Sequence, residues 1–155
     1  MMEAYLLLGL FFLLNVLDGF TTWLGIYGLP VELRATEANV LFKDVEKTFW
    51  PAMWRKGFLV ILFTMGLYYL ANLTGTNLRH AFYVMDVVLL IVVLNNFSVY
   101  SLRRLTHRRV RSPIGHLSDT FQRWGLSPRL SRYVAFYISI TIITAIVYTL
   151  VGVFI

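Results

Sequence analysis

The sequence predicts an all-α integral membrane protein with four transmembrane helices and short amphipathic helices in its loops. Three observations predict this fold: the mean hydropathy is +0.68, hydrophobic residues make up 58% of the 155 residues, and charged residues only 14%. A soluble domain carries about a quarter charged residues, so this chain has too few to cover a surface that faces water. Much of the surface must therefore face lipid, and we expect a single membrane domain over residues 1–155.

Four apolar segments are long enough to cross a bilayer as helices, which takes about 20 residues for roughly 30 Å of hydrocarbon. These segments cover residues 4–28, 54–73, 79–102 and 132–155. The start of the chain has neither a basic leader nor a small-residue cleavage site, so we expect the first segment to remain as a span.

The basic residues predict how the spans are oriented, because short cytoplasmic loops carry an excess of lysine and arginine. Of the fourteen basic residues, eight lie in the loop 103–132 and five in the loop before span two, whereas the remaining connection has only Arg79. We therefore expect both basic loops in the cytoplasm and both termini outside.

The second basic loop contains a predicted short helix, with Ser112-Pro113 as its start and Gly125 as its stop. Apolar residues recur on one side of it at helical spacing: Ile114, Leu117, Phe121 and Trp124. Either this helix lies in the headgroup layer with arginines facing anionic lipid, or it packs on the spans. The residues expected to bind lipid headgroups are Arg103, Arg104, Arg108, Arg109 and Arg111.

The first basic loop has weaker signals. Thr36 is placed to cap a helix that runs to Phe49, and Trp50 and Trp54 are typical of residues at a membrane interface. Pro51 is expected in the first turn of span two.

Span one carries polar residues that a lipid-facing helix would not hold. Asn15, Asp18 and Thr22 are spaced i, i+3 and i+7, so they share one helical face. Asp18 is about ten residues from the end of the span at Gly28, and a charge near the centre of a span costs about 2.5–3.5 kcal/mol. Asp18 must therefore face protein or water, and it must be either paired or protonated.

Span three contributes the rest of this polar set. Placing successive spans antiparallel puts Asn95 and Asn96 at a depth similar to Asp18, and Asp86 is a second carboxylate on the outer half of the same span. No basic residue lies well inside a span, so we expect neither aspartate to have a cation partner at its own depth. The nearest candidates to reach inward from the end of span two are Arg55 and Lys56.

Two interpretations of the polar residues stay open. Asparagine and threonine often join helices by hydrogen bonds of about 0.6–2 kcal/mol each. Intramembrane carboxylates instead often mark ion pathways, proton pathways or ligand sites.

Span four carries a ridge of small residues. Thr141, Ala145 and Thr149 lie on one face, and Gly152 follows. Such ridges let helix backbones approach closely, so this face is expected to pack against another helix, either in the same chain or in another subunit.

Catalytic and cofactor chemistry is not indicated. The chain has no cysteine, and His80, His107 and His116 are far apart without metal-ligand spacing. There is no glycine-rich phosphate loop and no nucleophile elbow. We expect no catalytic residue, no metal, no cofactor and no nucleic-acid partner, since the arginines lie between spans.

The run Asn15-Val16-Leu17-Asp18-Gly19-Phe20-Thr21-Thr22 resembles a family of small prokaryotic membrane proteins catalogued as a domain of unknown function. The family pattern is Asn-x-x-Asp-x-x-x-Thr, then a glycine, Glu-x-Asn-Pro, a lysine opening the next span and an asparagine late in the third. The later counterparts here are Gly28, Glu37, Asn39, Lys56 and Asn95 or Asn96, with Val40 in place of the proline. The resemblance covers residues 10–100 and implies a prokaryotic cell membrane but no activity. It adds Glu37 and Asn39 to the candidates at the cytoplasmic face.

Three hypotheses of function follow. The first is a non-enzymatic subunit of a homo-oligomer or of a larger membrane complex. The second is an ion or proton pathway lined by the intramembrane aspartate, asparagine and threonine residues. The third is a membrane enzyme that acts on lipid-linked or phosphorylated substrates.

Overall fold

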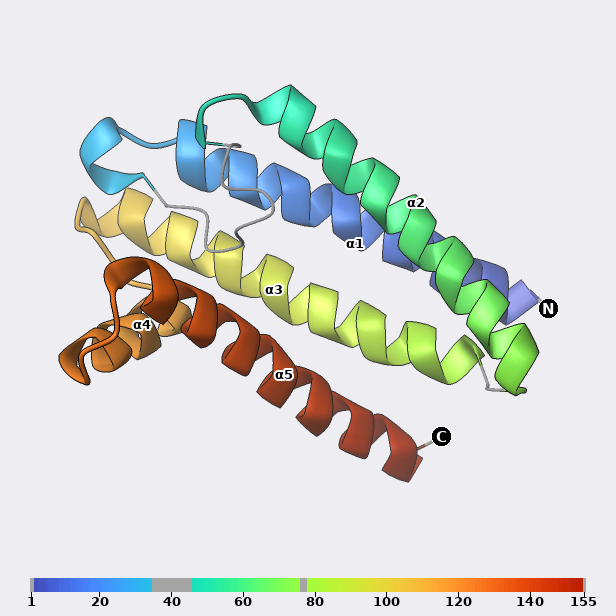
Figure 1. Cartoon of the computed structure of the whole chain (residues 1–155). Helices are drawn as coiled ribbons and strands as arrows, with labels where there is room; N and C mark the ends of the chain where they lie inside the picture. Colours follow the sequence, from blue (N-terminus) through green and yellow to red (C-terminus); the bar gives the residue numbers. More distant parts are fainter. Residues whose placement is uncertain (1, 35–45, 76–77, 155) are drawn as a thin grey trace.

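The computed structural model describes residues 2–34, 46–75 and 78–154 as an all-helical protein. Its elements are α1 (Met2–Tyr27), the 3-10 turn η1 (Val31–Leu33), α2 (Phe49–Thr74), α3 (Leu78–Thr106), α4 (Pro113–Arg123) and α5 (Pro128–Phe154). The helices α1, α2, α3 and α5 are each long and apolar enough to cross a membrane. Helices α1 and α3 run parallel, and α2 and α5 run in the opposite direction (Figure 1). The predicted all-α membrane fold is confirmed.

The helix ends follow local chemistry. Gly75, with φ of 66°, ends α2 in the left-handed conformation that glycine adopts without steric cost. Helix α4 starts as predicted: Pro113 occupies its first turn, and the Ser112 hydroxyl accepts a hydrogen bond from the Gly115 N–H at 3.2 Å. Helix α2 begins at Phe49, which is five residues before the predicted start of span two.

The core lies between α1 and α3, which make the most extensive helix–helix contact in the described chain. Leu7 and Phe11 of α1 and Phe82 of α3 form a buried cluster, with the two phenyl rings edge to face at 5.7 Å between centroids. Helix α2 covers this pair from outside, and only Ala52 and Ala71 of its residues are buried.

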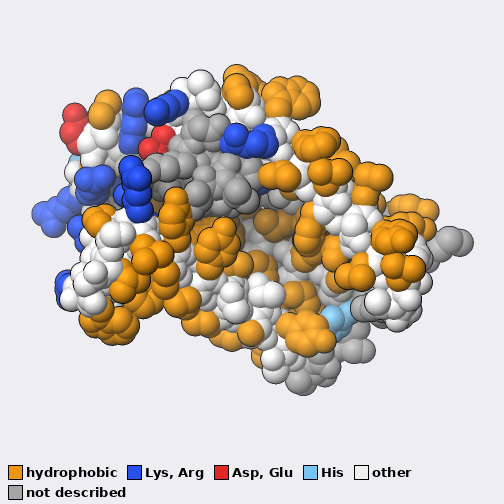
Figure 2. Space-filling view, viewed as in Figure 1, with side chains coloured by type: hydrophobic (Ala, Val, Ile, Leu, Met, Phe, Trp, Pro, Cys, Tyr) orange, Lys and Arg blue, Asp and Glu red, His pale blue; other side chains and the backbone are white. Residues whose placement is uncertain are grey.

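The surface separates apolar from basic side chains. Hydrophobic side chains cover much of the visible face of α2 and α5, whereas lysines and arginines gather at one end (Figure 2). We call this end, where α1 and α3 finish and α2 and α5 begin, the basic end. At the opposite end Glu3 joins α1 to α3, because its Oε1 lies 2.8 Å from Arg79 Nη2 and accepts a hydrogen bond from the Tyr83 hydroxyl at 2.8 Å.

Helix α4 packs against α5 at the basic end (Figure 1). The buried Ser118 hydroxyl donates to the Ser131 hydroxyl at 3.3 Å, which ties the two helices together. The predicted apolar stripe is only partly covered, since Ile114, Leu117 and Phe121 are half-buried and Trp124 is exposed. The predicted helix from Thr36 to Phe49 falls largely on residues 35–45, which lie outside the described residues.

Candidate functional site

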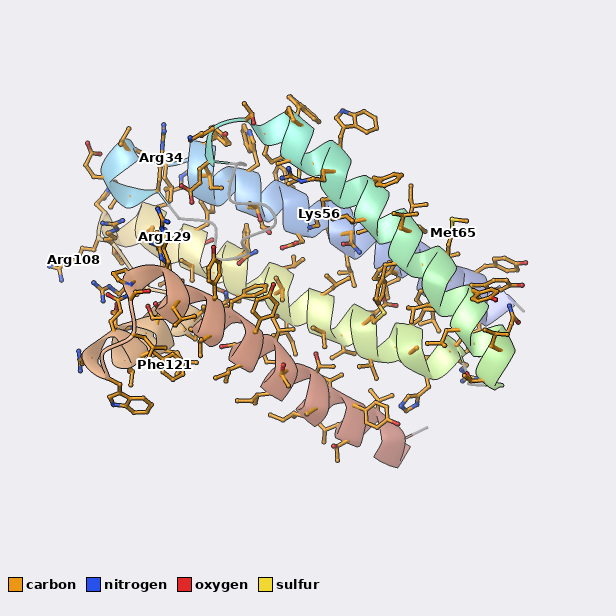
Figure 3. The ribbon with its side chains drawn as sticks, viewed as in Figure 1. Arg34, Lys56, Met65, Arg108, Phe121 and Arg129 are labelled. Atoms are coloured by element: carbon orange, nitrogen blue, oxygen red, sulfur yellow. The ribbon has the colours of Figure 1, made fainter. Side chains whose placement is uncertain are left out.

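Asp18 is the centre of a polar cluster that joins three helices. Its Oδ2 forms an ion pair with Lys56 Nζ of α2, and its Oδ1 accepts a hydrogen bond from Asn96 Nδ2 of α3 at 3.1 Å. The side chains of Asp18 and Lys56 are only 17% and 15% exposed. We call these three residues the Asp18 cluster; Lys56 reaches it from the side of α2 that faces α1 (Figure 3).

A few side chains of α2 contact α1 near this ion pair. A Cβ added at Gly19 would lie 3.0 Å from Met53 Sδ, which is tighter than most packed carbons tolerate. Ala52 is fully buried and packs with Ile26 of α1. One turn further along α2, the Lys56 ammonium also lies 3.5 Å from the backbone carbonyl of Asn15. Lys56 therefore reaches α1 next to the small residues Gly19 and Ala52.

The structure corrects the expectation that neither aspartate has a cation partner at its own depth. For Asp18 this expectation was wrong, because Lys56 is that partner. Helix α2 begins at Phe49, so Lys56 lies two turns inside the helix. Since α2 runs opposite to α1, this position is level with Asp18.

The other predicted members of the cluster have different partners. The Asn15 side chain donates to the Phe11 carbonyl of its own helix at 2.9 Å. Thr22 and Asn95 are half-buried and form no side-chain hydrogen bond within the described part of the chain. Thr21 is buried, and its hydroxyl donates to the Asp18 carbonyl at 3.1 Å. Of the predicted polar face on α1, only the Asp18 side chain contacts the polar side chains of other helices among the described residues. Of the two asparagines on α3, Asn96 is the one that binds Asp18.

Asp86 is separate from the Asp18 cluster. It lies ten positions before Asn96 on α3, about 15 Å along the helix axis. Its side chain is buried, with the residue 4% exposed, and neither carboxyl oxygen has a hydrogen-bond partner among the described residues. The two aspartates therefore differ. Both carboxyl oxygens of Asp18 have polar partners, whereas the buried carboxyl group of Asp86 has no hydrogen-bond partner among the described residues.

The remaining candidates near the basic end divide between the described and the undescribed part of the chain. Arg55 is exposed on α2, whereas the adjacent Lys56 is half-buried. Glu37 and Asn39 lie outside the described residues. Among the described residues, no group of three His, Cys, Asp or Glu side chains is placed to hold a metal ion.

Arg103 has a different position from the other arginines predicted to bind lipid. It is buried, and its guanidinium donates from Nε to the Val110 carbonyl at 2.8 Å and from Nη1 to the Leu33 carbonyl at 3.2 Å. It therefore fastens the segment after α1 and the segment before α4 to the end of α3. Sequence alone does not show this role, because it depends on where two loops return.

The other four arginines are exposed. Arg104 Nη1 donates to the Tyr100 hydroxyl at 2.9 Å, and Arg111 forms an ion pair with Asp119 of α4. Arg108 and Arg109 follow His107, whose φ of 50° turns the chain out of α3. Their binding to lipid headgroups stays a prediction.

No family model, no curated protein and no solved structure matches this chain. The pattern in span one therefore stays a resemblance, and function has to be inferred from the geometry.

Proposed function

We propose that the protein is a non-enzymatic subunit of a homo-oligomeric or larger membrane complex, with its basic end in the cytoplasm and both termini outside. The observation that carries this proposal is the state of the ridge on α5. Thr141, Ala145 and Thr149 are all exposed. Beside this ridge Tyr148 contacts His80 of α3, with ring centroids 5.2 Å apart, so the ridge itself is left open.

The side chains of this face favour a contact with another helix. The face is open and shallow, and it is lined by Ile140, Thr141, Thr144, Ala145, Tyr148 and Thr149. The Thr149 hydroxyl donates to the Ala145 carbonyl of its own helix at 2.9 Å, so it is satisfied within the membrane without a partner. Small side chains with satisfied hydroxyls permit close backbone approach, which favours association between helices where the hydrophobic effect gives no driving force.

Cysteine cross-linking tests this proposal, and the chain provides a clean background because it has no cysteine. We expect Ala145→Cys to give a disulfide-linked dimer in native membranes under mild oxidation. Ile146→Cys is the matched control and should stay largely monomeric, because Ile146 is equally exposed at nearly the same depth but lies about 100° around α5 from Ala145. Equal cross-linking of the two variants would contradict self-association through α5. Self-association would also be contradicted if neither variant cross-linked and the protein had the mass of a monomer in mild detergent.

Asp86 favours a second candidate, an ion or proton pathway. An unpaired ionised carboxylate is costly in an apolar interior, so a carboxyl that takes up and releases a proton suits this position better than a permanent charge. The Asp18 cluster would form the next polar position along the same two helices. The apolar residues between them, such as Leu89 and Val93 on α3, would then separate two polar positions.

A liposome assay distinguishes this candidate from the first. If Asp86 carries protons, proton flux driven by a potential should fall to the level of protein-free liposomes in Asp86→Asn and persist in Asp86→Glu. The wild-type protein must show flux above protein-free liposomes for this candidate to stand, and unchanged flux in Asp86→Asn would remove Asp86 from the pathway.

A further inference from the structure

The segment from Arg103 to Arg132 carries a large positive charge that the described structure leaves mostly on the surface. It holds eight arginines and one carboxylate, Asp119. That carboxylate is already paired with Arg111, and Arg103 is buried against backbone carbonyls. The exposed arginines that remain are Arg104, Arg108, Arg109, Arg123 and Arg129.

These arginines surround α4. Arg108 and Arg109 precede the helix, Arg123 ends it, and Arg129 lies in the first turn of α5. Figure 3 shows Arg108 and Arg129 at the basic end, together with Phe121 of α4. The contact between Ser118 and Ser131 joins α4 to α5, and the hydrogen bond from Arg103 to the Val110 carbonyl joins the segment that holds Arg108 and Arg109 to α3. We call the arginines around α4, and α4 itself, the basic surface.

Large apolar side chains are exposed among these charges. Leu105 is 78% exposed, Trp124 is 71% exposed and Leu130 is 51% exposed. Trp124 stands edge to face with Phe121 at 5.6 Å between ring centroids, which continues the apolar side of α4. Tryptophan beside arginine is typical of the layer where headgroups meet acyl chains.

We propose that the basic surface binds the phosphate groups of anionic phospholipids, while Leu105, Trp124 and Leu130 insert between their acyl chains. Arginine suits this partner because its planar guanidinium donates two parallel hydrogen bonds to one phosphate. Basic residues close to an anionic leaflet each strengthen attachment about fivefold. Helix α4 is then an in-plane helix held at a fixed position by α5.

Lipid retention measured by native mass spectrometry tests the proposal. The protein is exchanged into detergent with equal amounts of phosphatidylglycerol and phosphatidylcholine, and the retained lipids are counted. We expect the wild type to retain phosphatidylglycerol preferentially. The triple variant Arg108→Gln/Arg109→Gln/Arg123→Gln should lose this preference, with a drop of about fivefold for each arginine removed.

The chain offers a matched control. The double variant Glu3→Gln/Arg79→Gln removes an ion pair at the opposite end and leaves the net charge unchanged, so its lipid preference should equal that of the wild type. A triple variant with lysine at positions 108, 109 and 123 keeps the charge and should retain part of the preference, which shows that a loss in the glutamine variant is not a loss of fold.

The proposal would be overturned by either of two results. One is a wild-type protein that retains both lipids in the proportion supplied. The other is a glutamine variant that keeps the full preference for phosphatidylglycerol.

Discussion

Replacing Lys56 with methionine is expected to lower the free energy of unfolding by about 3–5 kcal/mol. The change leaves Asp18 with only the Asn96 amide, so a carboxylate that is 17% exposed loses its countercharge. Removal of one partner of a buried ion pair costs more than the pair itself contributes, because the charge left behind is neither paired nor well solvated. The loss of stability can be measured by circular dichroism, which follows unfolding as the mole fraction of SDS in mixed micelles is raised.

Two further variants show whether the pair is the cause. Asp18→Asn/Lys56→Met removes both charges, so it should recover most of the lost stability. Arg55→Met, an exposed neighbour on the same helix, should cost less than about 1 kcal/mol. If the double variant is as unstable as Lys56→Met, the lysine does not stabilise the protein through its ion pair with Asp18.

Replacing Arg103 with glutamine is expected to cost about 2–3 kcal/mol and to loosen the basic end. Two charge-assisted hydrogen bonds are lost, to the Val110 and Leu33 carbonyls. Arg103→Lys should recover only part of the loss, because an ammonium lacks the fork that spans two acceptors. The effect is local as well as global, since both carbonyls belong to connecting segments.

Hydrogen–deuterium exchange is the readout that separates this role from general destabilisation. Amides in the segments 28–34 and 108–112 should exchange faster in Arg103→Gln while those in the middle of α1 and α3 change little. Arg104→Gln is the control, because Arg104 is exposed and its hydrogen bond within the described residues goes to the Tyr100 hydroxyl of its own helix. Unchanged exchange in both segments would show that Arg103 does not fasten them.

The four apolar helices and α4 could be predicted from the sequence because each signal is local. Hydropathy over about 20 residues predicts a span, and Ser112-Pro113 and Gly125 delimit α4 by their capping preferences. The face that holds Asp18 was predictable for the same reason, since three polar residues within eight positions share one side of a helix.

The partner of Asp18 was harder to predict because it depends on the register between two helices. Lys56 follows the aromatic residues Phe49, Trp50 and Trp54, which resemble an interface segment rather than the interior of a span. The helix nevertheless starts at Phe49, which places the lysine two turns inside it. The sequence names Arg55 and Lys56 as the candidates to reach inward, and the structure shows that Lys56 pairs with Asp18.

The burial of Arg103 was also beyond the sequence. Arg103 is one of two adjacent arginines at the end of α3, and nothing in their order distinguishes the one that faces inward. Asp86 shares a helix with Asn96, but ten positions of apolar sequence separate them. The crossing angles and tilts of the helices decide which of these polar residues come into contact. Short-range sequence patterns carry no information about these angles.

The ion pair between Asp18 and Lys56 also bears on how the chain enters the bilayer during synthesis. Its members lie 38 residues apart on consecutive helices, so both have been translated before α3 is complete. As a hairpin, α1 and α2 carry two opposite charges that neutralise each other, and a neutral pair crosses hydrocarbon at lower cost than either ion alone. Asn96 arrives later, when the third helix docks onto a hairpin whose charges are already matched.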